Sequence, residues 1–139
     1  MNKLSSLDYY LYHAQRQMIK YYNRILLKPY DLSYQQYLVL MVLNESDGMP
    51  VLKLGERLAF QSGTITPIIK KMEIADLVSR SRSSEDERIV LVHLASKGKD
   101  LIEQINQIPE EMLVHSGITY ADYKHLMYLT NKIANNIEE

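Results

Sequence analysis

The chain has 139 residues, of which 46% are hydrophobic and 24% charged, a balance typical of one globular domain and not of a disordered or low-complexity chain. The absence of cysteine excludes disulfides, thiolate zinc sites, thiol nucleophiles and thiol-based redox sensing. The net charge of −1 gives no overall basic surface of the kind that nucleic-acid binding usually leaves.

Two helices are predicted at the start of the chain. The first carries an apolar stripe at helical spacing, runs for about 22 residues and ends near Pro29. The second begins at Ser33, where Gln36 completes a capping-box pattern, and reaches a turn at Asp47-Gly48. Residues 37–43 are all apolar, so this second helix is apolar on every side, which indicates that it is buried. The stripe of the first helix consists of Leu7, Leu11, Ala14, Met18, Tyr21 and Ile25.

The centre of the chain predicts a helix-turn-helix followed by a hairpin. Residues 51–58 form a short helix, and Ser62–Ile74 form a second one after a turn at Phe60-Gln61. Ile65, Ile68, Ile69 and Met72 are expected to face inward. Two segments with strand character, residues 78–82 and 89–94, then flank a polar loop, 83–87, that we expect to project from the body.

Two helices are expected in the last third. One is capped near Ser96, buries Leu101, Ile102, Ile105 and Ile108, and is ended by Pro109. The last is capped by Thr119, with Asp122 three residues on. Its stripe has coiled-coil-like spacing and consists of Leu126, Leu129, Ile133 and Ile137.

This order defines the expected fold class: mainly α (α+β), a winged helix-turn-helix over residues 33–95, within a single domain covering 1–139. One protomer cannot bury both terminal stripes on so small a central module. Residues 4–28 and 100–139 are therefore predicted to be dimerisation helices.

The motifs resemble those of the MarR family of regulators. The resemblance is carried by residues 62–73, 76–78, 86–88 and 93–98, and it covers nearly the whole chain. Residues 11–16 and 32–38 also resemble the branch that senses organic hydroperoxides. The resemblance implies a homodimeric, sequence-specific regulator, expected to be a repressor, bound to a pseudo-palindromic operator in double-stranded DNA.

The candidate DNA-binding residues come from the second helix of the pair and from the hairpin. Ser62, Thr64 and Thr66 lie in the first turns, where hydroxyls can meet phosphates or base edges, and Lys70 and Lys71 follow. The alternative is that Ser62 only caps the helix and that the two lysines only form a solvated face. In the hairpin the set comprises Arg82, Asp86 and Arg88.

Arg88 has two interpretations. On spacing alone, an arginine beside acids is most often a surface ion pair. The family resemblance implies instead that Arg88 enters the minor groove, whose negative potential attracts arginine, while Asp86 braces its guanidinium.

The N-terminal segment holds the effector-pocket candidates. Eight of the eleven tyrosines lie in the first 37 residues, and the set is Asp8, Tyr12, Tyr22, Tyr34 and Tyr37. The alternative for the tyrosines is that they pack amphipathic helices. In hydroperoxide-sensing relatives, tyrosines matching Tyr12 and Tyr22 hydrogen-bond a reactive cysteine, and Asp8 stands at that cysteine's position. Asp8 either locks one conformation, or helps to bind a small-molecule effector in place of peroxide, or caps the first helix.

Other functions have no support in the sequence. The four histidines lack metal-ligand spacing, and no nucleophile motif or phosphate-binding glycine loop is present, so we expect no metal, cofactor or enzymatic activity. No apolar run is long enough to span a membrane, and no signal peptide is evident, which favours the cytoplasm. The alternative function is a helical dimer that acts as a protein–protein interaction module.

Overall fold

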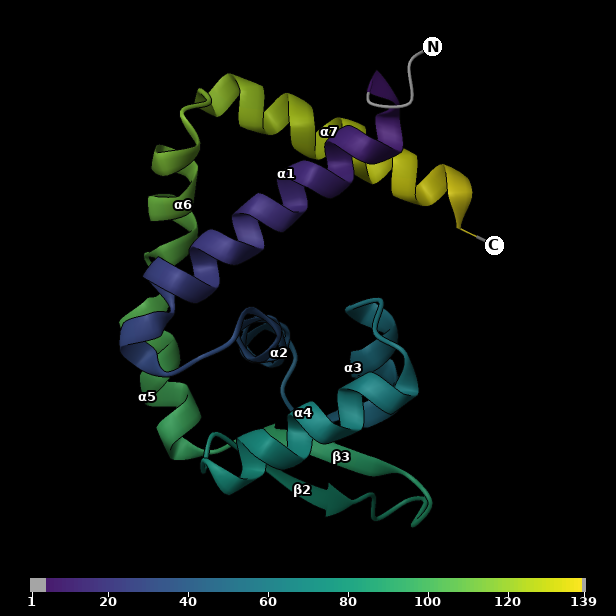
Figure 1. The fold of residues 1–139 in the computed structure, drawn as a ribbon. Coiled ribbons are helices and arrows are strands. Elements are labelled where there is room, and N and C mark those ends of the chain that lie inside the picture. The colour runs from purple at the N-terminus through teal and green to yellow at the C-terminus, as the bar shows by residue number, and fades with distance from the viewer. Residues whose placement is uncertain (1–4, 139) are drawn as a thin grey trace. The chain divides into compact units, whose positions relative to one another are not determined.

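The structure, a computed structural model, describes residues 5–138 (Figure 1). It divides into two compact units, one ending at Ile105 and one beginning at Asn106. No helix among the described residues is both long and apolar enough to cross a membrane.

The first unit begins with two helices joined by tight turns. α1 spans Leu7–Tyr21, followed by a π-helical turn, Tyr22–Leu26, and a 3-10 turn, Lys28–Tyr30. The helix predicted to end near Pro29 therefore continues to Leu26, but its last turn is π-helical and not α-helical: Leu27 N–H donates to the Tyr22 carbonyl at 2.8 Å.

α2 spans Tyr34–Glu45, and its predicted capping box is confirmed. The Ser33 hydroxyl accepts from Gln36 N–H at 3.2 Å, and the Gln36 side chain accepts from Ser33 N–H at 3.1 Å. Its burial is also confirmed, because Val39, Leu40 and Leu43 have no exposed surface. α2 is the central helix of the first unit's core.

The predicted helix-turn-helix is confirmed as α3, Val51–Arg57, and α4, Ser62–Ile74. Ile65, Ile69 and Met72 are fully buried, whereas Ile68 is only half-buried. The residue that caps α4 is Gln61, so the interpretation of Ser62 as a cap is wrong by one position.

A three-stranded antiparallel sheet follows, in the order β1-β3-β2. β2 spans Val78–Arg82 and β3 spans Val90–Leu94, as predicted to within one residue. β1, Met49–Pro50, was not predicted; it pairs through Met49 with Val92. α5, Ser96–Ile105, completes the unit. A Cβ on its Gly98 would lie 2.2 Å from the Leu77 carbonyl oxygen, so only glycine allows this close approach.

The second unit contains α6, Ile108–Ser116, and α7, Tyr120–Ile137. The expectation that Pro109 ends a helix is wrong: α5 ends at Ile105, and Pro109 lies in the first turn of α6, where its missing N–H is not needed. The capping box at Thr119 is confirmed, with Thr119 and Asp122 exchanging backbone-to-side-chain bonds of 3.1 Å.

Candidate DNA interface

The second helix of the pair, α4, presents a polar face. Ser62, Lys70 and Lys71 are exposed, and Thr64 and Thr66 are half-buried. The Thr66 hydroxyl donates to the Ser62 carbonyl at 3.4 Å, within the helix. The five predicted residues of α4 therefore lie on one helix, but only three of them are fully available to a large partner.

The hairpin loop holds an arginine in a fixed orientation. Arg88 Nε donates to Asp86 Oδ1 and Nη2 donates to Oδ2, both at 3.1 Å, and Arg88 N–H also donates to Oδ1. The Arg88 side chain remains 90% exposed. The bidentate pairing keeps the pKa of Asp86 below its usual value and that of Arg88 above its usual value. A permanently charged, braced guanidinium thus stands at the wing.

Arg82 makes a different contact. Its Nη1 donates to the Glu87 carbonyl at 2.7 Å, which ties the end of β2 to the loop. The Ser83 hydroxyl accepts from the N–H groups of Glu85 and Asp86. Arg82 and Ser83 therefore stabilise the loop conformation that presents Arg88.

Sequence reasoning did not single out Arg80, which pairs with α4. Arg80 Nε and Nη2 donate to Glu73 Oε1 at 3.2 and 3.0 Å. These bonds hold the pKa of Glu73 below its usual value, so the carboxylate is charged at neutral pH. The signal available in the sequence was the alternation of β2, which places Arg80 on the same face as the apolar Val78.

A cavity of about 490 Å³ lies between α3, α4 and the hairpin. Apolar side chains of Leu52 and Ile89 line it together with the polar Thr66. The two arginines described above, Arg80 and Arg88, also line the cavity, as does Lys53 of α3. The cavity thus combines apolar walls with cationic groups on the wing side of α4.

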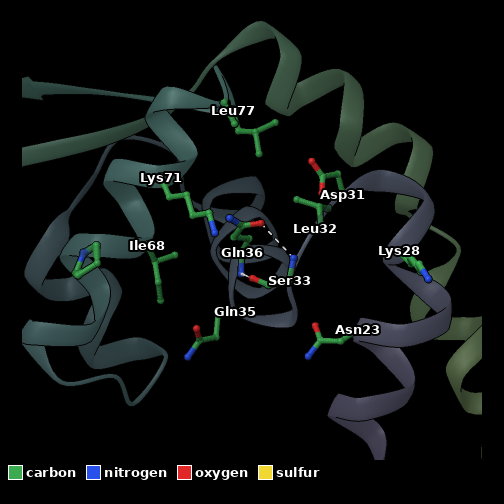
Figure 2. A pocket seen from close by; sticks show the side chains of 12 residues that line it. Asn23, Lys28, Asp31, Leu32, Ser33, Gln35, Gln36, Ile68, Lys71 and Leu77 are labelled. Atoms are coloured by element: carbon green, nitrogen blue, oxygen red, sulfur yellow. Dashed lines mark hydrogen bonds between the residues drawn. The ribbon is translucent and has the colours of Figure 1, made fainter.

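A second cavity, of about 640 Å³, lies between α4 and the segment that leads into α2. Figure 2 shows Lys71 extending from α4 toward Gln36 and Ser33 at the start of α2. Lys71 therefore differs from Lys70, because its side chain follows the wall of a cavity.

The structure brings together three of the five effector-pocket candidates. The ring centroids of Tyr22 and Tyr34 lie 4.9 Å apart, those of Tyr22 and Tyr37 5.3 Å, and those of Tyr34 and Tyr37 5.9 Å. Burial raises the pKa of all three phenols, most for Tyr22, which its neighbours affect as well. They are neutral hydroxyls at physiological pH.

The other two candidates lie on α1, away from this cluster, and are exposed. Asp8 is 14 residues before Tyr22, about 21 Å along a helix axis, and Tyr12 is 60% exposed. The interpretation of Asp8 as a cap is wrong, because Ser6 is the N-cap and Asp8 lies in the first turn. There its charge interacts favourably with the helix dipole.

The described residues contain no group of three or more His, Asp or Glu side chains arranged to hold a metal ion.

The pair α3–α4, with a three-stranded sheet and a projecting hairpin, is a winged helix-turn-helix, the class of fold that places one helix in the major groove of DNA. The described site has the parts that such a protein uses.

Comparison with known proteins assigns the family. The family described as transcriptional regulator SarA/Rot matches residues 20–105. The HTH-type transcriptional regulator MgrA of Staphylococcus aureus is 33% identical over 138 residues, which cover 99% of this chain and 94% of MgrA. The chain therefore belongs to the SarA/Rot family of transcriptional regulators, with a MarR-type winged-helix fold.

Two further proteins support this assignment. The organic hydroperoxide resistance transcriptional regulator of Bacillus subtilis (strain 168) is 41% identical over 122 residues, 88% of this chain and 82% of its own length. The structure of reduced AbfR bound to DNA is 25% identical, with a TM-score of 0.79 over 94% of this chain and 89% of that one. The predicted family resemblance and fold class are confirmed, and the family consists of regulators and not of enzymes.

Proposed function

We propose that the protein is a homodimeric repressor that binds a pseudo-palindromic operator sequence-specifically. The observation that carries the proposal is the Asp86–Arg88 pair, which holds an arginine that is 90% exposed at the wing beside an exposed helix of the right size for a major groove about 12 Å wide. In this arrangement α4 reads the major groove, and Arg88 enters the adjacent minor groove. Ser62, Thr64, Thr66, Lys70, Lys71 and Arg82 complete the interface.

The exposed terminal helices support the dimer. On α1, Leu7 is 61% and Ile25 55% exposed; on α7, Leu126 is 49% and Ile137 74% exposed. Apolar side chains in continuous stripes are rarely left in water. A second copy of the chain covers them, with residues 4–28 and 100–139 as the dimerisation helices and 33–95 as the winged helix.

Selection from a random duplex pool, followed by footprinting, tests the function. The dimer should protect roughly 16 to 20 base pairs with two half-sites centred about 34 Å apart, and its affinity should fall steeply with salt. A scrambled duplex of the same length serves as the control for non-specific binding. A chain that binds neither duplex at about 50 mM salt, or that binds as a monomer, contradicts the proposal.

The signal that releases the operator is, in this proposal, a small molecule. The chain has no thiol for peroxide to oxidise. The candidate contacts in the dimer are Asp8 and Tyr12 on α1 and the Tyr22–Tyr34–Tyr37 cluster, which joins the turn after α1 to α2. As a regulator of transcription, the protein is expected to act in the cytoplasm. Added hydroperoxide should leave operator binding unchanged.

A further inference from the structure

Arg80 has an unusual position for a charged residue. Along β2, it lies on the same face of the sheet as Val78, which is 2% exposed, and its cross-strand partner is Val92, which has no exposed surface. This is the face that packs against the core. A guanidinium here, at the border where the apolar face ends, needs hydrogen-bond partners on the side of α4.

Glu73 meets that need with a single oxygen. Both bonds from Arg80, through Nε and Nη2, go to Glu73 Oε1, so one edge of the guanidinium is fixed and the Nη1 group takes part in neither bond. The side chains of Arg80 and Glu73 are 32% and 37% exposed. The pair therefore links the last turn of α4 to the wing and leaves donors of Arg80 accessible at the surface.

The gap that this pair borders is the cavity of about 490 Å³ between α3, α4 and the hairpin. In B-DNA, one sugar–phosphate strand separates a major groove from the minor groove beside it. If α4 occupies the first groove and the wing the second, that strand must pass between α4 and the wing. The cavity lies in this gap, and Arg80 lines it.

We propose that this cavity receives the DNA backbone strand between the two grooves, and that Arg80, oriented by Glu73, donates a hydrogen bond to one of its phosphates. The inference rests on the proposed binding mode. Leu52 and Ile89 supply apolar walls for the deoxyribose rings, and Thr66 supplies a polar one. Glu73 is a positioning residue. Its charge opposes that of Arg80, so the contact depends on orientation more than on net attraction.

The test uses the full-length protein, its selected operator, and duplexes in which single phosphates are replaced by neutral methylphosphonates. Binding of the wild type should weaken about tenfold when the phosphate between the two grooves is neutralised, and Arg80→Gln should be insensitive at that phosphate alone. Arg80→Gln should also lower the salt slope by about one unit per protomer. Lys99→Gln, which removes the same charge from an exposed position on α5, is the matched control and should keep the wild-type phosphate profile.

Two further variants separate positioning from simple stability. Arg80→Lys keeps the positive charge but loses the guanidinium edge whose Nε and Nη2 both donate to Glu73. It should therefore retain the salt slope of operator binding and lose operator affinity. Glu73→Gln should reduce the ratio of operator to scrambled-duplex affinity, and this reduction should vanish in the Arg80→Gln background. Circular dichroism melting curves confirm that each variant is folded.

The inference is overturned if folded Arg80→Gln keeps the wild-type phosphate profile and salt slope. If Arg88→Ala still weakens binding in that case, the proposed function stands and only the role of Arg80 falls. If the wild type binds no DNA, both fall together.

Discussion

The winged helix and the terminal helices differ in how much of their apolar surface a single chain buries. Three ion pairs lie within the winged helix, Glu45–Arg57, Glu73–Arg80 and Asp86–Arg88, and helix α2 buries five of its residues and α4 three. Neither α1 nor α7 buries a single residue. One chain therefore supplies the contacts of the winged helix by itself, whereas it leaves the apolar side chains of α1 and α7 exposed, as the proposed dimer requires.

Removing α7 should affect operator binding more than any other change considered below. Deleting residues 119–139 removes the Leu126–Ile137 stripe, and the truncated chain should be a monomer or an aggregate in light scattering. Operator affinity should fall at least about 100-fold, because two linked half-site contacts become one.

The control for this deletion is Lys124→Gln together with Lys132→Gln, which change α7 without touching its apolar stripe. Both lysines lie over tyrosine rings of the same helix. This variant should remain a dimer. A truncated chain that forms a stable, DNA-binding dimer would show that α7 is not part of the dimer interface.

Within the winged helix, Arg88→Ala should cost about 1–3 kcal/mol of operator affinity with the fold intact, as expected of a groove contact. Fluorescence anisotropy with operator and scrambled duplexes measures this loss. Glu85→Ala, in the same loop, removes a charge of opposite sign and should not weaken binding. Operator affinity equal to wild type for Arg88→Ala would move the wing out of the interface.

The contrast between the two regions also explains what the sequence could predict. Local patterns were sufficient for the capping boxes at Ser33 and Thr119 and for the Asp86–Arg88 spacing, since each involves residues two or three positions apart. Contacts between segments that are far apart in the sequence could not be predicted from such patterns. β1 is a strand only because Met49 pairs with Val92.

The candidate site shows the same limit. Glu73 and Arg80 meet because the chain turns back from α4 into β2, which no local pattern reveals. Pro109 begins a helix where the sequence predicted that it would end one, because proline is tolerated at both places and only the position of the neighbouring turn decides between them. Site residues that depend on tertiary contact therefore escaped prediction.

A smaller effect is expected from the two lysines of α4. Lys70→Ala should lower the salt slope of operator binding by about one unit per protomer if Lys70 contacts a phosphate. Lys71 follows the wall of the larger cavity toward Gln36, so Lys71→Ala should lower the slope less. Titrations at four salt concentrations measure both slopes. Equal slopes for the two variants and the wild type would exclude both lysines from the phosphate contacts.

Substitution of Asp8 should change operator affinity least. It tests whether α1 transmits a signal to the winged helix. As an exposed first-turn carboxylate, Asp8 contributes about 0.3–1 kcal/mol to helix stability through the dipole, and Glu110, in the first turn of α6, provides a matched control. Asp8→Asn and Glu110→Gln should both lower the melting temperature slightly.

Only Asp8→Asn should change operator affinity, by a few-fold, because the proposal places Asp8 with Tyr12 and Tyr22 at the effector site of the dimer. Asp8→Cys should make operator binding sensitive to hydroperoxide, since a thiol can then be oxidised beside phenols that hydrogen-bond the product. Unchanged affinity for Asp8→Asn, together with peroxide-indifferent binding by Asp8→Cys, would leave Asp8 with a role in helix stability alone.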